Sequence, residues 1–450
     1  MKPAQLSGTA LPDHDQLARS AELALEVARR AGADAADISI SVSHALTVGV
    51  RRGELETVEF QQDHDVSIGV YYGERHAAAS STDLSEASIR QSVAAACEMA
   101  RYTEADPWQG LADPERLARE FPDLQLEFPW SLDVDAARDI ALRCEQAAFD
   151  HDPRISNSEG AGVDTHHGIS LYANSHGFAG SHRGTRHSID CTVLAGDGDS
   201  LERDYDYSSA RNPEALASPE AIGRAAAMRC LRRMDPQKLS TRQVPVLFEP
   251  RLARGLIARF VSAISGGALY RKASFLLDSA GEQLFPEFIS ISERPHLHAA
   301  QGSAAFDAEG VATCDRELVE AGVLTGYVLS SYSARRLGLA TTGNAGGTHN
   351  LLVSAGGLDF DGLLKEMGTG LIVTEMMGQG ANMLTGDYSR GAAGLWVENG
   401  EIAYPVEEIT VAGNLRDMFR AIRAVGSDID RMGNIQCGSL LVDGMIVAGG

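Results

Sequence analysis

Residues 250–267 of this 450-residue chain read PRLARGLIARFVSAISGG, a pattern typical of a helix with one buried face. The apolar residues recur at steps of three and four: Leu252, Leu256, Ile257, Phe260, Val261 and Ile264. Pro250 suits the first turn, and Gly266 and Gly267 are expected to end the helix. The remaining face offers only arginine, serine and alanine, so its role beyond packing is the question that the sequence raises first.

Downstream of this helix the sequence predicts one large, sheet-rich domain over residues 240–450. The run VPVLFEP is a strand that leads into the helix, and the rest is rich in glycine and short strands. LWVENGEIAYPV predicts a hairpin on an Asn399-Gly400 turn. NLRDMFRAIRAVG predicts a helix, and SLLVDGMIVAG a closing pair of strands.

Upstream, one order of elements occurs twice. DQLARSAELALEVARRAG, alternating strands and LSEASIRQSVAAACEMARY predict a helix–antiparallel-sheet–helix segment over residues 1–105. A linker with proline and acidic residues follows, and the same order returns over residues 124–236, with slight identity between the halves. We therefore predict an α+β fold, with N-terminal and middle segments of this kind before the C-terminal domain.

Composition excludes several classes of function. A formal net charge of −23 without any basic run disfavours nucleic-acid binding. No apolar run approaches the roughly 20 residues of a membrane-spanning helix, and the start lacks a secretory pattern. The six cysteines are far apart with no CxxC, which argues against a zinc knuckle or disulfide scaffold and favours a cytoplasmic protein with reduced thiols.

Histidines suggest two metal sites, and neither is well supported. Six potential ligands occur within 26 residues: His166, His167, His176, His182, His187 and Cys191. On a strand, His187 and Cys191 share a face but lie about 13 Å apart, too far to chelate one ion. His296 and His298 would point the same way on a strand, but no third ligand lies near them in the sequence. Histidines that pack or face solvent are the favoured interpretation of both groups.

Several long stretches, in order, resemble the TldD/PmbA (modulator of gyrase) family, and within it the PmbA/TldE branch. The stretches are SAISGGALYRKASFLLDS, SSYSARRLGLATTGNAGGTHN, LLKEMGTGLIVTEMMGQG, TGDYSRGAAGLWVENGEIAYPVEEITVAGNL and NIQCGS. The resemblance covers most of the chain and is dense from about Lys238. It implies an α+β architecture and a role in cytoplasmic peptide proteolysis.

The resemblance also identifies what this chain lacks. The catalytic branch of the family, TldD, carries HExxxH on a helix and a cysteine near the C-terminus as a further zinc ligand. Here the helix at 250–267 is the equivalent, and Ala258, Arg259 and Ala263 stand roughly where ligands and base would be. No histidine occurs between His187 and His296, and no His-Glu dipeptide exists. Cys437 matches the cysteine position, and we expect it to be a buried thiol.

The sequence thus predicts a non-catalytic subunit, a pseudoenzyme without catalytic residues and without a bound cofactor. The resemblance implies a heterodimer with a TldD-type peptidase that holds the zinc and acts on extended or unfolded peptides, in antibiotic-precursor maturation, antitoxin degradation or both. A homodimer in isolation stays open. Glycine-rich segments are the candidates for close approach of a peptide backbone, with fold-shaping turns as the equally weighted alternative: Gly378, Gln379, Gly380, Asp387, Tyr388 and Arg390.

Two other functions stay open at this point. The chain could be a metallopeptidase in its own right, with a non-standard set of His296, His298 and Cys437. It could also bind protein as an indirect modulator of DNA gyrase, since the net charge of −23 disfavours direct DNA binding. Metal content of the isolated chain separates the first of these from the subunit hypothesis.

Overall fold

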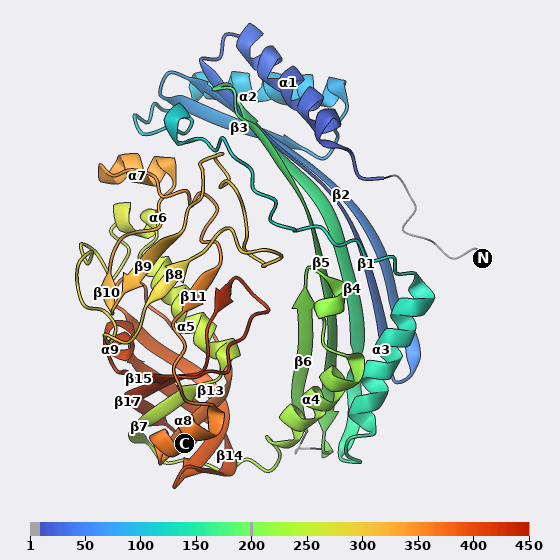
Figure 1. The fold of residues 1–450 in the computed structure, drawn as a ribbon, viewed down its shortest axis with the longest axis vertical. Helices are drawn as coiled ribbons and strands as arrows, with labels where there is room; N and C mark the ends of the chain where they lie inside the picture. The colour runs from blue at the N-terminus through green and yellow to red at the C-terminus, as the bar shows by residue number, and fades with distance from the viewer. Residues whose placement is uncertain (1–9, 199–200, 450) are drawn as a thin grey trace.

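The computed structural model describes residues 10–198 and 201–449 (Figure 1). Its helices are α1 His14–Arg30, α2 Glu86–Tyr102, α3 Val134–Phe149, α4 Pro219–Leu231, α5 Pro250–Ala263, α6 Gly266–Tyr270, α7 Ser331–Leu337, α8 Phe360–Met367 and α9 Leu415–Arg420. Its strands in the first half are β1 Ala35–Arg51, β2 Glu54–Tyr72, β3 Arg75–Ser81, β4 Ile155–Asn174, β5 Ala179–Ala195 and β6 Glu202–Ala210. Those in the second half are β7 Arg242–Phe248, β8 Ile291–Glu293, β9 Arg316–Glu320, β10 Val323–Leu324, β11 Leu351–Val353, β12 Gly370–Met377, β13 Asp387–Glu398, β14 Glu401–Asn414, β15 Ile422–Val425, β16 Ile435–Gln436 and β17 Leu440–Ala448. The fold is α+β, as predicted.

The two upstream segments share a single six-stranded sheet. Its order is β3-β2-β1-β4-β5-β6, so β1 and β4 pair at the centre and join the segments. Each segment runs helix, three strands, helix in the same order, α1 to α2 and α3 to α4. The domain limits at 105, 124 and 236 stay a prediction, but the sheet makes one continuous layer of both segments.

The two faces of this sheet have opposite character. The even-numbered residues of β1 are apolar except for His44: Ile38, Ile40 and Val42 pack against α1 and α2, and Leu46 and Val48 pack against α3 and α4. The odd-numbered face carries serine and threonine. In Figure 1 the long strands form a curved wall, with α3 outside it and the C-terminal domain on the side toward which the wall curves. The polar face therefore turns toward the C-terminal domain.

The C-terminal domain holds a six-stranded sheet of order β14-β13-β12-β7-β17-β15 and a five-stranded sheet of order β10-β9-β8-β11-β16. The predicted hairpin is confirmed, with positive φ of 54° at Asn399 and 79° at Gly400. Two predictions near the C-terminus are wrong. The expected helix stops at Arg420 because Ile422–Val425 pairs with β17. The expected strand pair is one strand, in which a bulge at Gly444 absorbs what reads as a turn.

Helix α5 ends earlier than its sequence suggests, so the glycine stop is also wrong. The last helical residue is Ala263, and Ser265 then caps a new short helix by accepting a hydrogen bond from the Ala268 amide. Gly266 lies inside α6, where a Cβ would come within 2.2 Å of the Ser333 Oγ of α7. The glycine is thus required by close packing of α6 on α7 and not by helix termination.

Buried charges fix the first sheet to the C-terminal domain. Glu249, just before α5, accepts two hydrogen bonds from Arg232, at 2.7 and 2.9 Å, and one from Arg229 at 3.3 Å. Arg254 of α5 donates to the hydroxyl of Tyr207 on β6 at 2.9 Å. Arg251 pairs with Asp206 and lies over the Tyr207 ring. These contacts hold α4 and β6 against α5 in one orientation.

Among the described residues, the helices are each too short or too polar to span a lipid bilayer.

Candidate functional site

Helix α5 carries the positions that the family resemblance assigns to zinc ligands and base. Ala258 and Arg259 are partly exposed, whereas Ala263 is fully buried in the core of the C-terminal domain. Residues five positions apart on a helix lie about 140° apart around its axis. Ala263 therefore faces the core, about 140° around the axis from Ala258 and one turn after Arg259.

Cys437, the other matched position, is a buried thiol. It belongs to the apolar core, and its Sγ donates to the Gly438 carbonyl at 3.1 Å. Burial, reinforced by the charge of Asp428, raises the pKa of Cys437 to about 12. Burial thus favours the neutral thiol over the thiolate near pH 7.

The histidines do not gather around a common point. His296 is exposed and its Nε2 lies 3.0 Å from Thr313 Oγ1, and His298 is exposed as well. His187 is buried between Thr165 Oγ1 at 2.8 Å and the Phe128 carbonyl at 2.9 Å. In the ranges that the structure describes, no three histidine, cysteine, aspartate or glutamate side chains lie together as a metal site would require. The set His296, His298 and Cys437 is accordingly not assembled, and these residues do not fit a zinc ion.

The predicted peptide-groove residues lie in and after the loop between β12 and β13. Gly378, Gln379 and Gly380 are exposed. A Cβ on Gly380 would lie 1.8 Å from the Ser389 carbonyl oxygen, and the Ser389 amide donates to the Gly380 carbonyl at 2.7 Å. The close backbone approach at Gly380 is therefore made to the chain's own β13. This contact fits the alternative interpretation of the sequence, in which Gly380 shapes a turn of the fold.

The other three groove candidates differ in their exposure. Asp387 is exposed and accepts a hydrogen bond from Thr385 Oγ1 at 2.7 Å. Tyr388 is buried, and burial raises the pKa of its phenol although Arg390 and Arg259 oppose the rise. Arg390 donates to the Met376 carbonyl at 3.2 Å. Tyr388 thus lies near enough to both Arg390 and Arg259 of α5 to feel their charges, a proximity that the sequence did not predict.

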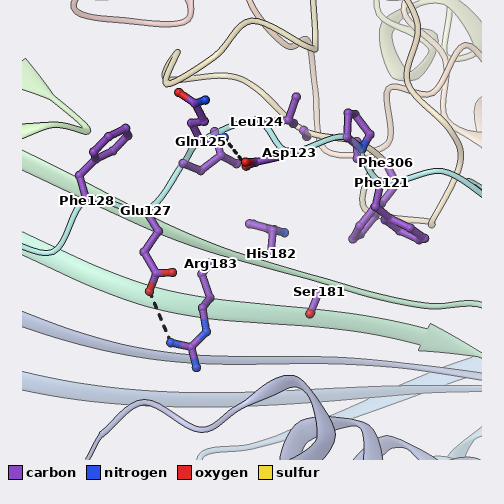
Figure 2. A pocket seen from close by; sticks show the side chains of 14 residues that line it. Phe121, Asp123, Leu124, Gln125, Glu127, Phe128, Ser181, His182, Arg183 and Phe306 are labelled. Carbon is purple, nitrogen blue, oxygen red and sulfur yellow. Dashed lines mark hydrogen bonds and ion pairs between the residues drawn. The ribbon is translucent and has the colours of Figure 1, made fainter.

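The sequence also missed a cleft between the polar face of the first sheet and the C-terminal domain. Two cavities lie in it, with volumes of about 520 and 390 Å³, and a third of about 1030 Å³ lies between the linker and the C-terminal domain. Figure 2 shows the first, where Glu127 and Arg183 pair beneath His182, and Phe121 and Phe306 close one end. Burial lowers the pKa of His182, which favours its neutral imidazole. The lining of this first cavity thus includes a neutral imidazole, aromatic rings and the Glu127–Arg183 ion pair.

The linker between α2 and α3 crosses this cleft as an extended chain. Ala118 donates its amide to the Gly310 carbonyl at 2.9 Å, and Ala312 donates to the Arg116 carbonyl at 2.9 Å. On the opposite side, the Thr185 amide of β5 donates to the Leu126 carbonyl at 2.9 Å. The alternation in LQLEF, residues 124–128, is the sequence signal that could have identified this strand-like course.

The polar face also holds a carboxyl group with a raised pKa, Asp190, from which we predict a pH effect on stability. Burial, then the charge of Asp164, raises the pKa of Asp190 to about 6. In the unfolded chain the group titrates near pH 3.9. Between these values the folded state binds more protons, so the stability contributed by this group falls as pH rises from about 4 to 6. Asp190→Asn should raise the melting temperature at pH 7.5 and change it little at pH 3.5.

Asp152→Asn is the matched control with the opposite sign. Arg154 lowers the pKa of Asp152, a half-buried surface residue, to about 2 through paired hydrogen bonds. Its contribution is present above about pH 4 and lost as pH falls toward 2, so the variant should be slightly less stable than the parent at pH 7.5. Equal melting shifts for Asp190→Asn at both pH values would contradict the assignment of a raised pKa.

Comparison with known proteins shows the family to which this chain belongs. Three models of PmbA/TldA metallopeptidase domains match: domain 1 at residues 36–100, the central domain at 127–234 and the C-terminal domain at 241–449. The protein thus has the architecture of this class of metallopeptidases along nearly its whole length. The chain belongs to the PmbA/TldD family.

Similar proteins and structures agree with this. The metalloprotease PmbA homolog of Haemophilus influenzae is 49% identical over 453 residues, covering 100% of both chains. Metalloprotease PmbA of Escherichia coli O157:H7 is 49% identical over 433 residues, 96% of each chain. A Bacteroides thetaiotaomicron structure described as a candidate modulator of DNA gyrase has a TM-score of 0.92 at 28% identity, covering 97% of this chain and 99% of its own.

A structure of TldE from Thermococcus kodakarensis shares the fold, with a TM-score of 0.82 at 19% identity over 95% of this chain and 99% of its own.

Proposed function

We propose that this chain is the non-catalytic subunit of a cytoplasmic zinc peptidase complex, in which a TldD-type partner supplies the zinc and the catalytic base for cleavage of extended peptides. One observation carries the proposal. The helix that would hold HExxxH has alanine and arginine at those positions, and its last position, Ala263, points into a filled core. Neither an alanine nor a guanidinium can serve as a zinc ligand or take a proton from a zinc-bound water.

The chemistry of Cys437, the other position that matches the zinc site of the catalytic branch, supports the same function. Zinc in a peptidase needs ligands that hold it while one coordination position stays open for water. Cys437 lies buried in the apolar core, and one cysteine without imidazole partners makes a poor zinc site. The alternative, a peptidase using His296, His298 and Cys437, would need these residues to move together from separate places.

The cleft supports a role in holding extended peptides. Its sheet wall is polar, and its other wall is formed by backbone and side chains of residues 304–308 and 345–349. The linker already runs through it in an extended form, held by backbone hydrogen bonds to both walls. Extended chains are recognised through such main-chain bonds, which read little of the side-chain sequence. Peptide-antibiotic precursors, antitoxins and unfolded segments are substrates of this kind.

The decisive experiment compares the chain alone with the chain co-expressed with the HExxxH relative from the same host. Zinc per chain is measured by plasma mass spectrometry, and cleavage by release of a quenched fluorophore from an unstructured peptide. The isolated chain should contain no stoichiometric zinc and cleave nothing. The co-purified pair should contain about one zinc per heterodimer and cleave the peptide in a chelator-sensitive way.

Cys437→Ala serves as the control on the metal assignment. Because the thiol is not a ligand in this proposal, the variant should leave both zinc content and cleavage of the pair unchanged. Stoichiometric zinc with chelator-sensitive cleavage in the isolated parent chain, lost in Cys437→Ala, would overturn the proposal in favour of an independent metallopeptidase.

A further inference from the structure

One edge of the first sheet is left open over residues 54–61 of β2, a segment called the open edge below. β1 pairs with this segment on one side, with Val48 opposite Val58 and Leu46 opposite Phe60. On the other side, β3 pairs with β2 only from Val66 to Tyr72. Within the part of the chain that the structure describes, no strand pairs with the outer side of the open edge. Every residue of the segment is exposed.

The open edge continues the apolar face of the sheet beyond its helical cover. Cross-strand partners share a face, so Phe60 and Val58 lie on the face where Leu46 and Val48 are buried under α3. Yet Leu55, Val58 and Phe60 are 45%, 49% and 48% exposed. An apolar strip beside an unpaired strand is a combination that isolated soluble proteins avoid, because it invites strand addition.

The opposite edge of the sheet shows what completes such a site. There β6 pairs with β5 only from His187 to Ala195. Beyond β6 the chain's own linker lies against β5. The Thr185 amide donates to the Leu126 carbonyl, and the Phe128 amide donates to Thr185 Oγ1, both at 2.9 Å. The two segments of the sheet repeat one order of elements, so the uncovered part of β2 is the counterpart of the part of β5 that the linker covers.

The charge of the open edge selects its occupant. The segment reads ELETVEFQ, with Glu54, Glu56 and Glu59 and no lysine or arginine. The chain as a whole carries a net charge of −23, so a second copy would bring two acidic edges together. A strand that alternates apolar with basic side chains would cover Leu55, Val58 and Phe60 and pair with the carboxylates.

We infer that the open edge is the docking site for an extended strand of the partner subunit, one with apolar residues on one face and lysine or arginine on the other. The inference rests on the proposed function, because it takes the occupant from the zinc-bearing partner. Strand addition would supply backbone hydrogen bonds along the edge, and the acidic side chains would select the basic partner over a copy of this chain.

The test uses the co-purified pair and the chain alone in hydrogen–deuterium exchange with mass spectrometry. Amides of residues 54–61 should exchange at least tenfold more slowly in the pair than in the chain alone. A zero-length carbodiimide crosslinker should join the glutamates of the open edge to lysines of the partner. A concentration-dependent protection of the same amides in the chain alone would show self-pairing and overturn the assigned occupant.

A triple variant, Leu55→Lys with Val58→Lys and Phe60→Lys, removes the apolar strip and reverses the charge of the edge. It should weaken the pair at least tenfold in Kd. The control replaces three other exposed apolar residues by lysine, Tyr102, Met228 and Leu384, which are 86%, 52% and 59% exposed. This control should bind as the parent does.

The outcomes separate the two proposals. A stable, active pair in which residues 54–61 stay unprotected, or in which the triple variant binds like the parent, overturns the docking site and leaves the proposed function standing. Failure of the parent chain to form any pair with the HExxxH relative overturns both.

Discussion

Glu249→Ala should destabilise the protein by about 3–5 kcal/mol, the cost of leaving a buried charge pair without one partner. The Glu249 side chain is 8% exposed and is the carboxylate that Arg232 reaches with two nitrogens. Without Glu249, the Arg232 guanidinium loses the carboxylate that it binds with two nitrogens, and Arg229 loses one of its partners. Both arginines lie at the contact between α4 and the start of α5. The change is measured as the free energy of unfolding in urea.

Glu220→Ala is the matched control for this prediction. Arg143 and Glu220 also form a short pair, at 2.8 Å, but the two side chains are 56% and 38% exposed. Water and salt screen such a pair, so the variant should lose no more than about 1 kcal/mol. The double variant Glu249→Leu with Arg232→Met should recover part of the loss, since it leaves no unpaired charge from that pair. Equal losses for Glu249→Ala and Glu220→Ala would contradict a buried interdomain network.

Gly223→Ala should destabilise the protein by about 3 kcal/mol, at the upper end of the range for overpacking a core. Gly223 lies in α4, where a Cβ would come within 2.0 Å of the Cys144 carbonyl oxygen and 3.1 Å of the Ala148 amide nitrogen of α3. Both contacting atoms belong to the backbone, which cannot move away by a change of side-chain rotamer. The helices would have to separate and open the core that they share with the sheet.

Gly255→Ala makes the same change in another helix with the opposite expected sign. Gly255 lies on the exposed side of α5, and its Cβ would meet no described atom within 4 Å. Alanine there should stabilise the protein by about 0.5–1 kcal/mol, because it restricts the unfolded chain and favours the helix. Urea unfolding of the two variants side by side checks the pair. Loss of stability in both, or gain in both, would show that helix propensity and not the α3–α4 approach decides the effect.

These two glycines illustrate what the sequence could not reveal about packing. Each reads as a mild weakness inside an otherwise good helical pattern. Only the position of α3 against α4 makes Gly223 necessary, while Gly255 stays replaceable. The same limit applies to Gly266, which reads as a helix stop and is in fact where α6 packs on α7.

The absence of the zinc-binding motif could be predicted from the sequence, whereas the cleft could not. The missing HExxxH follows from the sequence in any register, because no histidine lies between His187 and His296. The cleft did not follow, since its walls come from β5, the linker and residues 304–308, which are far apart in the sequence. The six groove residues stay a prediction, with Gly380 engaged by the chain's own β13.

The sequence by itself determined the helices and long strands, the Asn399-Gly400 hairpin and the absence of the zinc-binding pattern, because periodicity, turn chemistry and residue identity are local properties. The tertiary structure decided the rest. It joined the two upstream segments through β1 and β4, ended α9 at Arg420 so that Ile422–Val425 could pair with β17, and turned Ala263 into the core. Each of these depends on contacts between distant parts of the chain, where burial and sheet pairing outweigh the local preference of a short segment.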